Sequence, residues 1–203
     1  MTMSKGRLIV FSAPSGCGKG TMLAEILKDE KFYVSVSATT RKPREGEVDG
    51  VNYHFISRED FLKKIEENAF IEHAEYCSNF YGTLKSEVDN KLEQGINVIL
   101  EIEVQGAMKI RDIRPDAIFV FVAPPSINEL RRRLKKRGTE SDEVIEERIS
   151  KAAGEIMLAE KYDYVVVNAA LEDAVSDFLT IIRAEELKSE FSGEIINEVL
   201  KNA

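Results

Sequence analysis

Short apolar segments alternate with helical stretches along most of the chain. The apolar segments are rich in β-branched and aromatic side chains, and they lie at 8–12, 98–103, 118–122 and 164–167. Strands that are apolar on both faces and separated by helices are typical of a parallel sheet covered on both sides. The pattern therefore predicts a doubly wound α/β fold with a parallel sheet at its centre.

The stretch at about 33–83 follows a different pattern, with shorter apolar segments that are separated by turn signals. The segments are 33–36, 53–56 and 71–76, and the turn signals are Gly46 and Asp49-Gly50. Short strands broken by such turns predict a small, mostly β insertion in the α/β domain.

Two helix starts carry the signature of a capping box. Ser57 and Ser126 each stand three residues before a carboxylate, Asp60 and Glu129 respectively. This spacing satisfies the free N–H groups of a first helical turn and predicts helices over 58–68 and 127–137. Gly138 is expected to end the second of these helices.

A further helix is expected from Asp142 to about residue 161. Its apolar side is formed by Ile145, Ile149, Ala152 and Ile156, so Arg148 should project from another side. With the helix before it, this segment predicts a helical lid at about 126–161. A long helix should follow at 171–188, and a short amphipathic one should run through 199. The core of a single domain is then expected at about 7–32, 84–125 and 162–203.

Composition narrows the class of protein. The chain has 203 residues, of which 43% are hydrophobic and 32% are charged, as in an ordinary one-domain globular protein. Neither an apolar run of about 20 residues nor a signal-peptide pattern occurs, which predicts a cytoplasmic protein without a membrane partner. The net charge of −8 argues against nucleic acid as a partner and suits a monomer or a homodimer equally.

The cysteines and histidines lack the spacing of a disulfide framework or a metal site. Cys17 and Cys77 are therefore expected to be reduced thiols, and His54 and His73 to be structural or surface residues. Cys17 precedes a helix, where a thiol pKa can be lowered, but a small filler is the favoured interpretation.

Glycines and a lysine cluster between the first strand and the next helix. The segment reads Ala13-Pro14-Ser15-Gly16-Cys17-Gly18-Lys19-Gly20-Thr21. Its glycines let backbone N–H groups turn inward, and Lys19 adds positive charge at the positive end of a helix dipole. The segment therefore predicts a site for a nucleoside triphosphate, with a plain glycine-rich turn as the alternative.

The loop departs from the strict phosphate-binding pattern at two places. Ala13 replaces the usual first glycine, and Gly20 follows Lys19 where serine or threonine is usual, so that the hydroxyl of Thr21 comes one place late. We therefore expect Mg²⁺ to be held by phosphates and water, with Thr21, Glu101 or Glu103 acting through that water.

Several motifs, taken together, resemble the guanylate kinase family from about Leu8 to Asn168. Besides the loop at 13–21, they are Thr39-Thr40-Arg41 with Pro43-Arg44, Gly50 with Tyr53 and Phe55, Phe70-Ile71-Glu72, Tyr81-Gly82-Thr83, and Glu101-Ile102-Glu103 with Gln105-Gly106. The resemblance implies a P-loop kinase with an insertion that binds a nucleoside monophosphate. Arginines concentrated at 41–44 and 131–137 in an acidic chain agree with small anionic ligands.

The resemblance assigns the acceptor site to the insertion. It implies that Arg41, Arg44, Tyr53 and Tyr81 surround the phosphate of GMP, where guanidinium groups form charge-assisted contacts. It also implies that Glu72 binds guanine, because this base presents adjacent N–H donors to a carboxylate. Ser37, Thr83 and Glu101 would complete the base pocket.

The resemblance assigns the donor site to the loop and the lid. Lys19, Arg137 and Arg148 are implied to act on the phosphates of ATP, and with Arg41 and Arg44 they form the expected catalytic set. Asn168 is expected to border the adenine. Arg131, Arg132 and Arg133 are expected on the solvated face of their helix.

The expected reaction converts ATP and GMP to ADP and GDP in purine nucleotide metabolism, with dGMP as a second acceptor. One alternative keeps the fold and changes the acceptor to AMP or another monophosphate, which Glu72 disfavours. The other is a non-catalytic module that binds a phosphorylated peptide, although such modules typically lack a full phosphate loop or its lysine. A nucleic-acid-binding P-loop protein is disfavoured by the negative charge.

Overall fold

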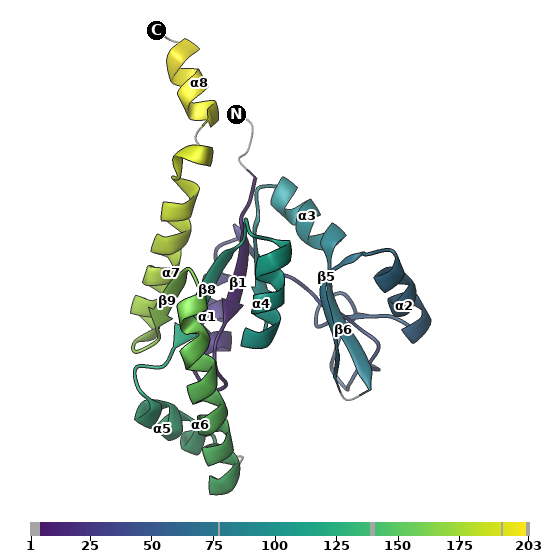
Figure 1. Ribbon diagram of the computed structural model, residues 1–203, viewed down its shortest axis with the longest axis vertical. Helices are drawn as coiled ribbons and strands as arrows, with labels where there is room; N and C mark the ends of the chain where they lie inside the picture. The colour runs from purple at the N-terminus through teal and green to yellow at the C-terminus, as the bar shows by residue number, and fades with distance from the viewer. Residues whose placement is uncertain (1–4, 77, 139–140, 192, 202–203) are drawn as a thin grey trace. The chain divides into compact units, whose positions relative to one another are not determined.

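The computed structural model describes residues 5–76, 78–138, 141–191 and 193–201. The chain forms two compact units. The first, here called the P-loop unit, contains Ser12–Asp29 and Phe119–Ala203, and the second, called the β-rich unit, contains Lys5–Phe11 and Glu30–Ile118. Figure 1 shows the elements of both units and labels many of them.

A five-stranded sheet has the order β2-β7-β1-β8-β9. Its strands are β2 (Phe32–Val34), β7 (Asn97–Glu101), β1 (Leu8–Ser12), β8 (Ile118–Ala123) and β9 (Tyr164–Val167). Pairing is parallel between β2 and β7, between β7 and β1, and between β8 and β9. Every residue of β1 is buried, as expected for a strand covered on both faces. The predicted parallel α/β sheet is confirmed.

The end of β7 differs from the prediction of a strand over 98–103. The strand ends at Glu101, and Glu103 is the N-cap residue of α4 (Val104–Ile113). The backbone N–H of Ile102 still donates to the carbonyl of Phe11 in β1, after which the chain leaves the sheet and enters the helix. Glu101 is therefore the last residue of the strand, whereas Glu103 belongs to the start of the helix.

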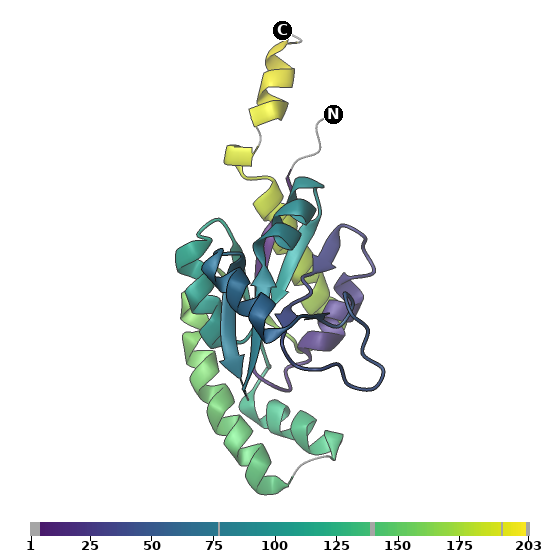
Figure 2. The same ribbon diagram turned by 90° about the vertical axis from the view of Figure 1, so that its right-hand side faces the viewer.

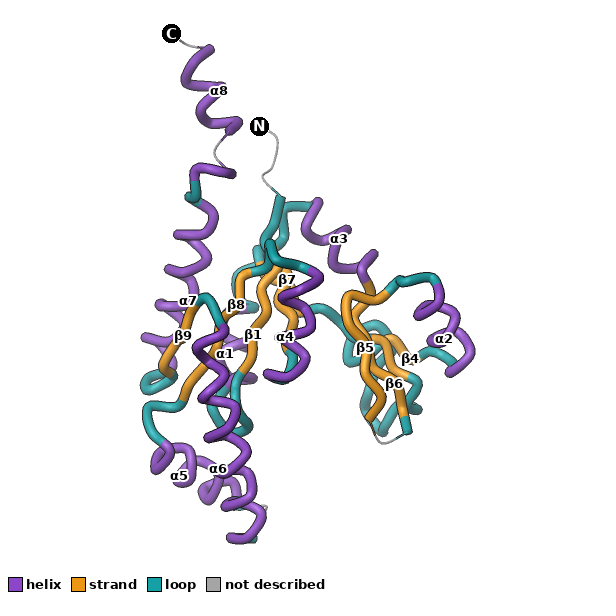
Figure 3. The backbone as a smooth tube through the Cα atoms, viewed as in Figure 1, coloured by secondary structure: helices purple, strands orange, loops and turns teal. Residues whose placement is uncertain are grey.

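A second, four-stranded sheet lies in the β-rich unit and has the order β4-β3-β6-β5. Its strands are β3 (Ala38–Thr39), β4 (His54–Phe55), β5 (Phe70–Tyr76) and β6 (Asn79–Leu84). Helix α2 (Arg58–Glu66) covers it through Phe61, whose ring stacks on Phe70 at 4.4 Å and on Phe80 at 5.2 Å. Figure 3 shows these short strands beside α2. The prediction that 33–36 is a strand of this β insertion is wrong, because β2 pairs with β7 in the larger sheet.

Helices make up most of the P-loop unit. They are α1 (Lys19–Ile26), α5 (Ile127–Arg137), α6 (Asp142–Met157), α7 (Leu171–Glu186) and α8 (Gly193–Lys201), with short 3-10 helices η1 (Leu158–Lys161) and η2 (Ser189–Phe191). Helices α5 and α6 lie side by side (Figure 2) and are joined by an ion pair of 2.8 Å between Arg131 and Glu146. Within the part of the chain that the structure describes, every helix is too short or too polar to span a membrane.

The helix caps agree with the capping boxes seen in the sequence. The hydroxyls of Ser57 and Ser126 accept hydrogen bonds from the backbone N–H groups of Asp60 and Glu129. Gly138 ends α5 in the left-handed conformation, with φ of 65°. Both predicted helix starts are confirmed, because capping depends on residues close in the sequence.

Candidate active site

The glycine-rich loop at 13–21 connects β1 to α1 and requires glycine at two positions. Gly16 and Gly18 have φ of 92° and 83°, which residues with a Cβ rarely adopt. Neighbouring atoms also exclude a side chain, since a Cβ on Gly16 would lie 2.8 Å from Leu134 Cδ2 and one on Gly18 would lie 2.6 Å from Asn168 Nδ2. Gly18 is the N-cap of α1, so Lys19 is the first residue of the helix. The predicted order of strand, loop and helix is confirmed.

The side chain of Asn168 supports the loop. Its amide Nδ2 donates to the carbonyl of Cys17 at 2.7 Å, and only 5% of the residue is exposed. The backbone carbonyl of Asn168 accepts a hydrogen bond of 2.9 Å from Arg133 Nη2, and Arg133 Nε donates to Glu129. The expectation that Arg133 belongs to a solvated face is therefore wrong. A chain of polar contacts leads from α5 through the end of β9 to the loop.

Cys17 lies inside the loop as a fully buried thiol. Burial raises its pKa to about 12, so the thiol stays protonated at neutral pH. This result supports the interpretation of Cys17 as a small filler and contradicts a lowered thiol pKa at the helix start. The prediction for Cys77 lies outside the described residues.

Arg148 of α6 contacts the loop directly. Its Nη1 donates to the hydroxyl of Ser15 at 3.1 Å, whereas Ile145, Ile149 and Ala152 bury the opposite side of the helix. The predicted separation of Arg148 from the apolar side is confirmed. The other expected lid arginine, Arg137, ends α5, but its side chain lies outside the described residues.

The start of α1 presents Gly20 and Thr21 to solvent. Nothing lies within 4 Å of the position that a Cβ on Gly20 would occupy. Glycine at this position is thus not required by packing, in contrast to Gly16 and Gly18.

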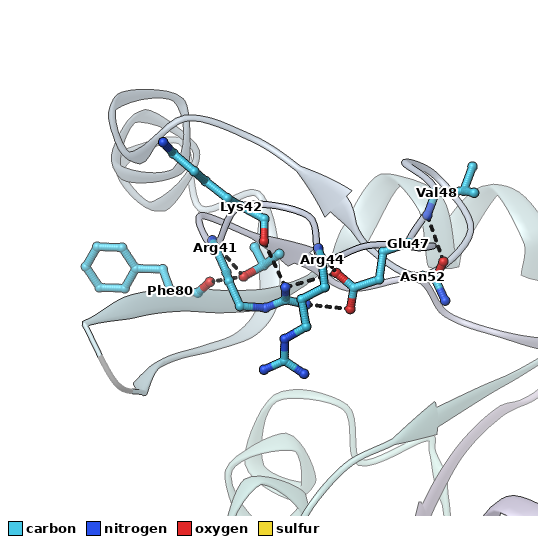
Figure 4. A network of polar contacts seen from close by, with 8 residues as sticks. Arg41, Lys42, Arg44, Glu47, Val48, Asn52 and Phe80 are labelled. Atoms are coloured by element: carbon cyan, nitrogen blue, oxygen red, sulfur yellow. Dashed lines mark hydrogen bonds and ion pairs between the residues drawn. The ribbon is translucent and has the colours of Figure 1, made fainter.

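The β-rich unit holds a cluster of arginines around one glutamate. Arg41 donates to both carboxylate oxygens of Glu47, at 2.9 Å from Nη1 and 2.8 Å from Nη2, as Figure 4 shows. The backbone N–H of Arg44 donates to the same carboxylate at 2.7 Å. The hydrogen bonds between the two side chains, and then their opposite charges, raise the pKa of Arg41 and lower the pKa of Glu47. The exposed guanidinium of Arg44 points away from this network (Figure 4).

Two tyrosines expected at the phosphate site lie in this cluster. The guanidinium carbon of Arg41 lies 5.3 Å from the centroid of the Tyr53 ring, within range of a cation–π contact. The rings of Tyr53 and Tyr81 meet edge to face at 5.9 Å. The structure therefore brings together three of the four side chains expected around the phosphate, and the loop places the fourth, that of Arg44, on the same segment.

Glu72 and Thr83 face each other across β5 and β6. They are partners in the strand register, and the Thr83 hydroxyl donates to Glu72 Oε1 at 2.8 Å. Burial raises the pKa of Glu72, while the hydrogen bond from Thr83 opposes this shift. Glu72 is thus a half-buried carboxylate with a fixed orientation and one oxygen that Thr83 does not use.

The other residues expected at the guanine site or near magnesium lie at the ends of strands or helices. Ser37 precedes β3, and its carbonyl accepts a hydrogen bond from His54 N–H at 2.9 Å. Glu101 ends β7 and Glu103 caps α4, and both are exposed. Among the described residues, no three histidine, cysteine or acidic side chains gather into a group that could hold a metal ion.

Sequence reasoning assigned no role to Glu47 or Glu87, and it placed Arg133 on a solvated face. Glu47 follows Arg44 by three residues, yet no spacing rule pairs it with Arg41, six residues away in a loop. Arg133 and Glu87, which accepts three hydrogen bonds in the β-rich unit, act on partners distant in the sequence.

The loop and the parallel sheet define the class of protein. A glycine-rich loop that follows a buried strand and ends in a lysine at a helix start is the phosphate site of P-loop nucleotide-binding proteins. The family is identified by comparison with known proteins. The guanylate kinase family model matches residues 5–185.

Individual relatives agree with this match. A guanylate kinase of Clostridium perfringens (strain SM101) is 50% identical over 186 residues, covering 91% of this chain and 86% of that protein. One of Thermus thermophilus is 46% identical over 197 residues, covering 97% of this chain and 90% of that protein. The crystal structure of guanylate kinase from Anaplasma phagocytophilum matches with a TM-score of 0.70 at 37% identity, covering 93% of this chain and 90% of that one. The chain belongs to the guanylate kinase family and is an ATP:GMP phosphotransferase.

Proposed function

We propose that the P-loop unit binds the phosphates of ATP, and that the β-rich unit binds GMP and dGMP. The observation that carries the second assignment is the pairing of two features in one small sheet and its loops. One is the oriented carboxylate of Glu72, and the other is the cationic and phenolic cluster around Arg41. The carboxylate can accept hydrogen bonds from guanine, and the cationic and phenolic groups can bind a phosphate.

On the donor side, the backbone N–H groups of 13–21 and Lys19 would surround the triphosphate. Arg148 already contacts this loop through Ser15, so its guanidinium stands where it can neutralise phosphate charge. We assign Arg137 the same kind of role from the family resemblance, and Asn168 a place beside the adenine. The segment 126–161 would then act as the lid, and 33–83 as the region that binds the monophosphate.

On the acceptor side, Glu47 keeps the guanidinium group of Arg41 in a fixed orientation before GMP binds. The exposed Arg44 would meet the phosphate first, and the Tyr53 and Tyr81 hydroxyls would donate to its oxygens. The ionised Glu72 would accept the ring N–H and the amino N–H of guanine, with Thr83, Ser37 and Glu101 around the base. Adenine lacks this pair of donors, so the same carboxylate disfavours AMP.

The reaction needs no protein nucleophile. An oxygen of the GMP phosphate attacks the γ-phosphoryl group of ATP, the bond to the β-phosphate oxygen breaks, and ADP leaves. Lys19, Arg41, Arg44, Arg137 and Arg148 would act by positioning the phosphates and balancing charge that spreads over the migrating group.

The residues present fit a magnesium ion carried in by ATP. The described residues hold no cluster of protein ligands, and the exposed Thr21, Glu101 and Glu103 offer oxygens that suit contacts through water. When bound, Mg²⁺ would offset negative charge on the ATP phosphates. Because the substrates are ATP and GMP, we also propose a cytoplasmic location.

A coupled ADP-release assay over GMP, dGMP, AMP, CMP and UMP tests these assignments. The wild-type enzyme is expected to prefer GMP, with dGMP second. Glu72→Gln should lower kcat/KM for GMP by about 10²-fold, because the amide has one acceptor oxygen in place of two and turns an N–H donor toward the donors of guanine. Arg44→Ala should raise KM for GMP and leave KM for ATP unchanged.

The alternatives give different results in the same assay. Equal turnover of AMP and GMP would contradict the base assignment and favour another acceptor. Absence of turnover with every monophosphate would favour a phosphopeptide-binding module. A Glu72→Gln enzyme with the wild-type preference for GMP would remove Glu72 from the base site.

A further inference from the structure

A single carboxylate in the β-rich unit accepts three hydrogen bonds from distant parts of the chain. Glu87 lies in the first turn of α3 (Lys85–Glu93). Its Oε1 accepts from the Tyr33 hydroxyl at 2.7 Å and from the Val36 backbone N–H at 3.0 Å. Its Oε2 lies 2.8 Å from His54 Nε2. The side chain is only 16% exposed, so these partners replace most of its contact with water.

The partners of Glu87 stand next to residues proposed to bind GMP. Val36 directly precedes Ser37, at the base site, and His54 directly follows Tyr53, at the phosphate site. The two segments also meet each other, because His54 N–H donates to the Ser37 carbonyl at 2.9 Å. Glu87 thus holds both segments from one side through one rigid helix.

The third partner strengthens this arrangement. Tyr33 belongs to β2, which pairs with β7 in the larger sheet and so links the network to the core of the unit. Burial and the hydrogen bond to Glu87 both raise the pKa of Tyr33, so its hydroxyl remains a donor at neutral pH. Lys91, one helical turn after Glu87, lies 4.9 Å from the centre of the Tyr33 ring.

We infer that Glu87 is a positioning residue for the acceptor site, fixing the segments that carry Ser37 and Tyr53 so that GMP meets a preorganised pocket. Preorganisation lowers the ordering cost of binding, so its loss appears as weaker GMP binding. The three hydrogen-bond partners of Glu87 all lie in the β-rich unit, whereas the proposed ATP site belongs to the P-loop unit. The inference rests on the proposed acceptor site.

The test compares steady-state kinetics of Glu87→Ala and Glu87→Gln with a matched control. Glu93→Gln makes the same chemical change on the exposed end of the same helix and is expected to behave as the wild type. Glu87→Ala should raise KM for GMP by about tenfold, because it removes every acceptor, with KM for ATP unchanged and kcat little changed. Glu87→Gln retains a carbonyl for Tyr33 and Val36 and should raise KM for GMP only about threefold.

A second measurement keeps the inference testable if Glu87→Ala is poorly folded. Tyr33→Phe removes one donor without changing the carboxylate, and it should by itself raise KM for GMP and leave KM for ATP unchanged, because Glu87 then loses one of its three contacts. Calorimetric titration with GMP alone should show the same weakening as KM.

Three results would overturn the role of Glu87. One is an unchanged KM for GMP in Glu87→Ala. Another is an equal rise of KM for ATP and for GMP in that variant. The third is a rise of KM for GMP in Glu93→Gln as large as the rise in Glu87→Gln. Arg44→Ala separates this failure from failure of the acceptor site itself. If Arg44→Ala raises KM for GMP and Glu87→Ala does not, the proposed function stands and only the inference fails.

Discussion

Replacing Gly18 by alanine should destabilise the protein through two separate effects in the phosphate loop. The φ of 83° costs a residue with a Cβ about 1–2 kcal/mol. The new Cβ would also lie 2.6 Å from Asn168 Nδ2, the atom that donates to the Cys17 carbonyl. Loss of a buried hydrogen bond costs about 1–3 kcal/mol. We expect the free energy of unfolding to fall by roughly 2–5 kcal/mol in total.

Gly20→Ala is the matched control, two positions further along the loop. No atom lies within 4 Å of its added Cβ, and the residue is already helical, so alanine should stabilise the fold by about 0.5 kcal/mol. Thermal unfolding followed by circular dichroism should show a Tm that is lower by roughly 5–15 °C for Gly18→Ala and unchanged or slightly higher for Gly20→Ala. The reasoning is refuted if Gly18→Ala unfolds at the wild-type temperature, or if both variants lose the same stability.

Three further predictions concern single side chains. Lys19→Ala should lower kcat by about 10²–10³-fold with an unchanged Tm, and normal turnover would contradict the proposed donor site. Because burial raises the pKa of Glu72, its charge costs stability above that folded-state pKa, so Glu72→Gln should stabilise the ligand-free protein at neutral pH. This gain should vanish as the pH falls through the folded-state pKa of Glu72 toward its ordinary value near 4.5, and urea unfolding at several pH values measures it. Iodoacetamide at pH 8 should leave Cys17 unmodified in the folded enzyme, as peptide mapping by mass spectrometry would show, since burial holds its pKa near 12.

The parts of the fold that depend on neighbouring residues were predictable from the sequence. The caps at Ser57 and Ser126 follow from side chains three residues apart, and the buried strands follow from continuous apolar runs. The placement of β2 was not predictable in this way. Its pairing with β7 depends on residues far along the chain, and a short amphipathic strand fits either sheet.

The same limit applies to the sites. The glycine and lysine pattern of the loop indicates phosphate binding by itself, because its chemistry is contained in one segment. The resemblance, and not spacing, suggested a role for Glu72. The bond that orients its carboxylate comes from Thr83 on the neighbouring strand. Likewise, the periodicity of α5 cannot show that Arg133 reaches the carbonyl of Asn168.

The hydrogen bond between Asn168 and Cys17 also bears on the order of folding. The loop lies near the start of the chain, yet the groups that support it belong to Asn168 and Arg133, which a ribosome adds much later. A nascent chain that ends before β9 can form β1 and α1 but lacks the amide that holds the carbonyl of Cys17. The nucleotide loop should therefore reach its final shape only when the last strand of the sheet is in place, so ATP would bind the finished protein and not its growing precursor.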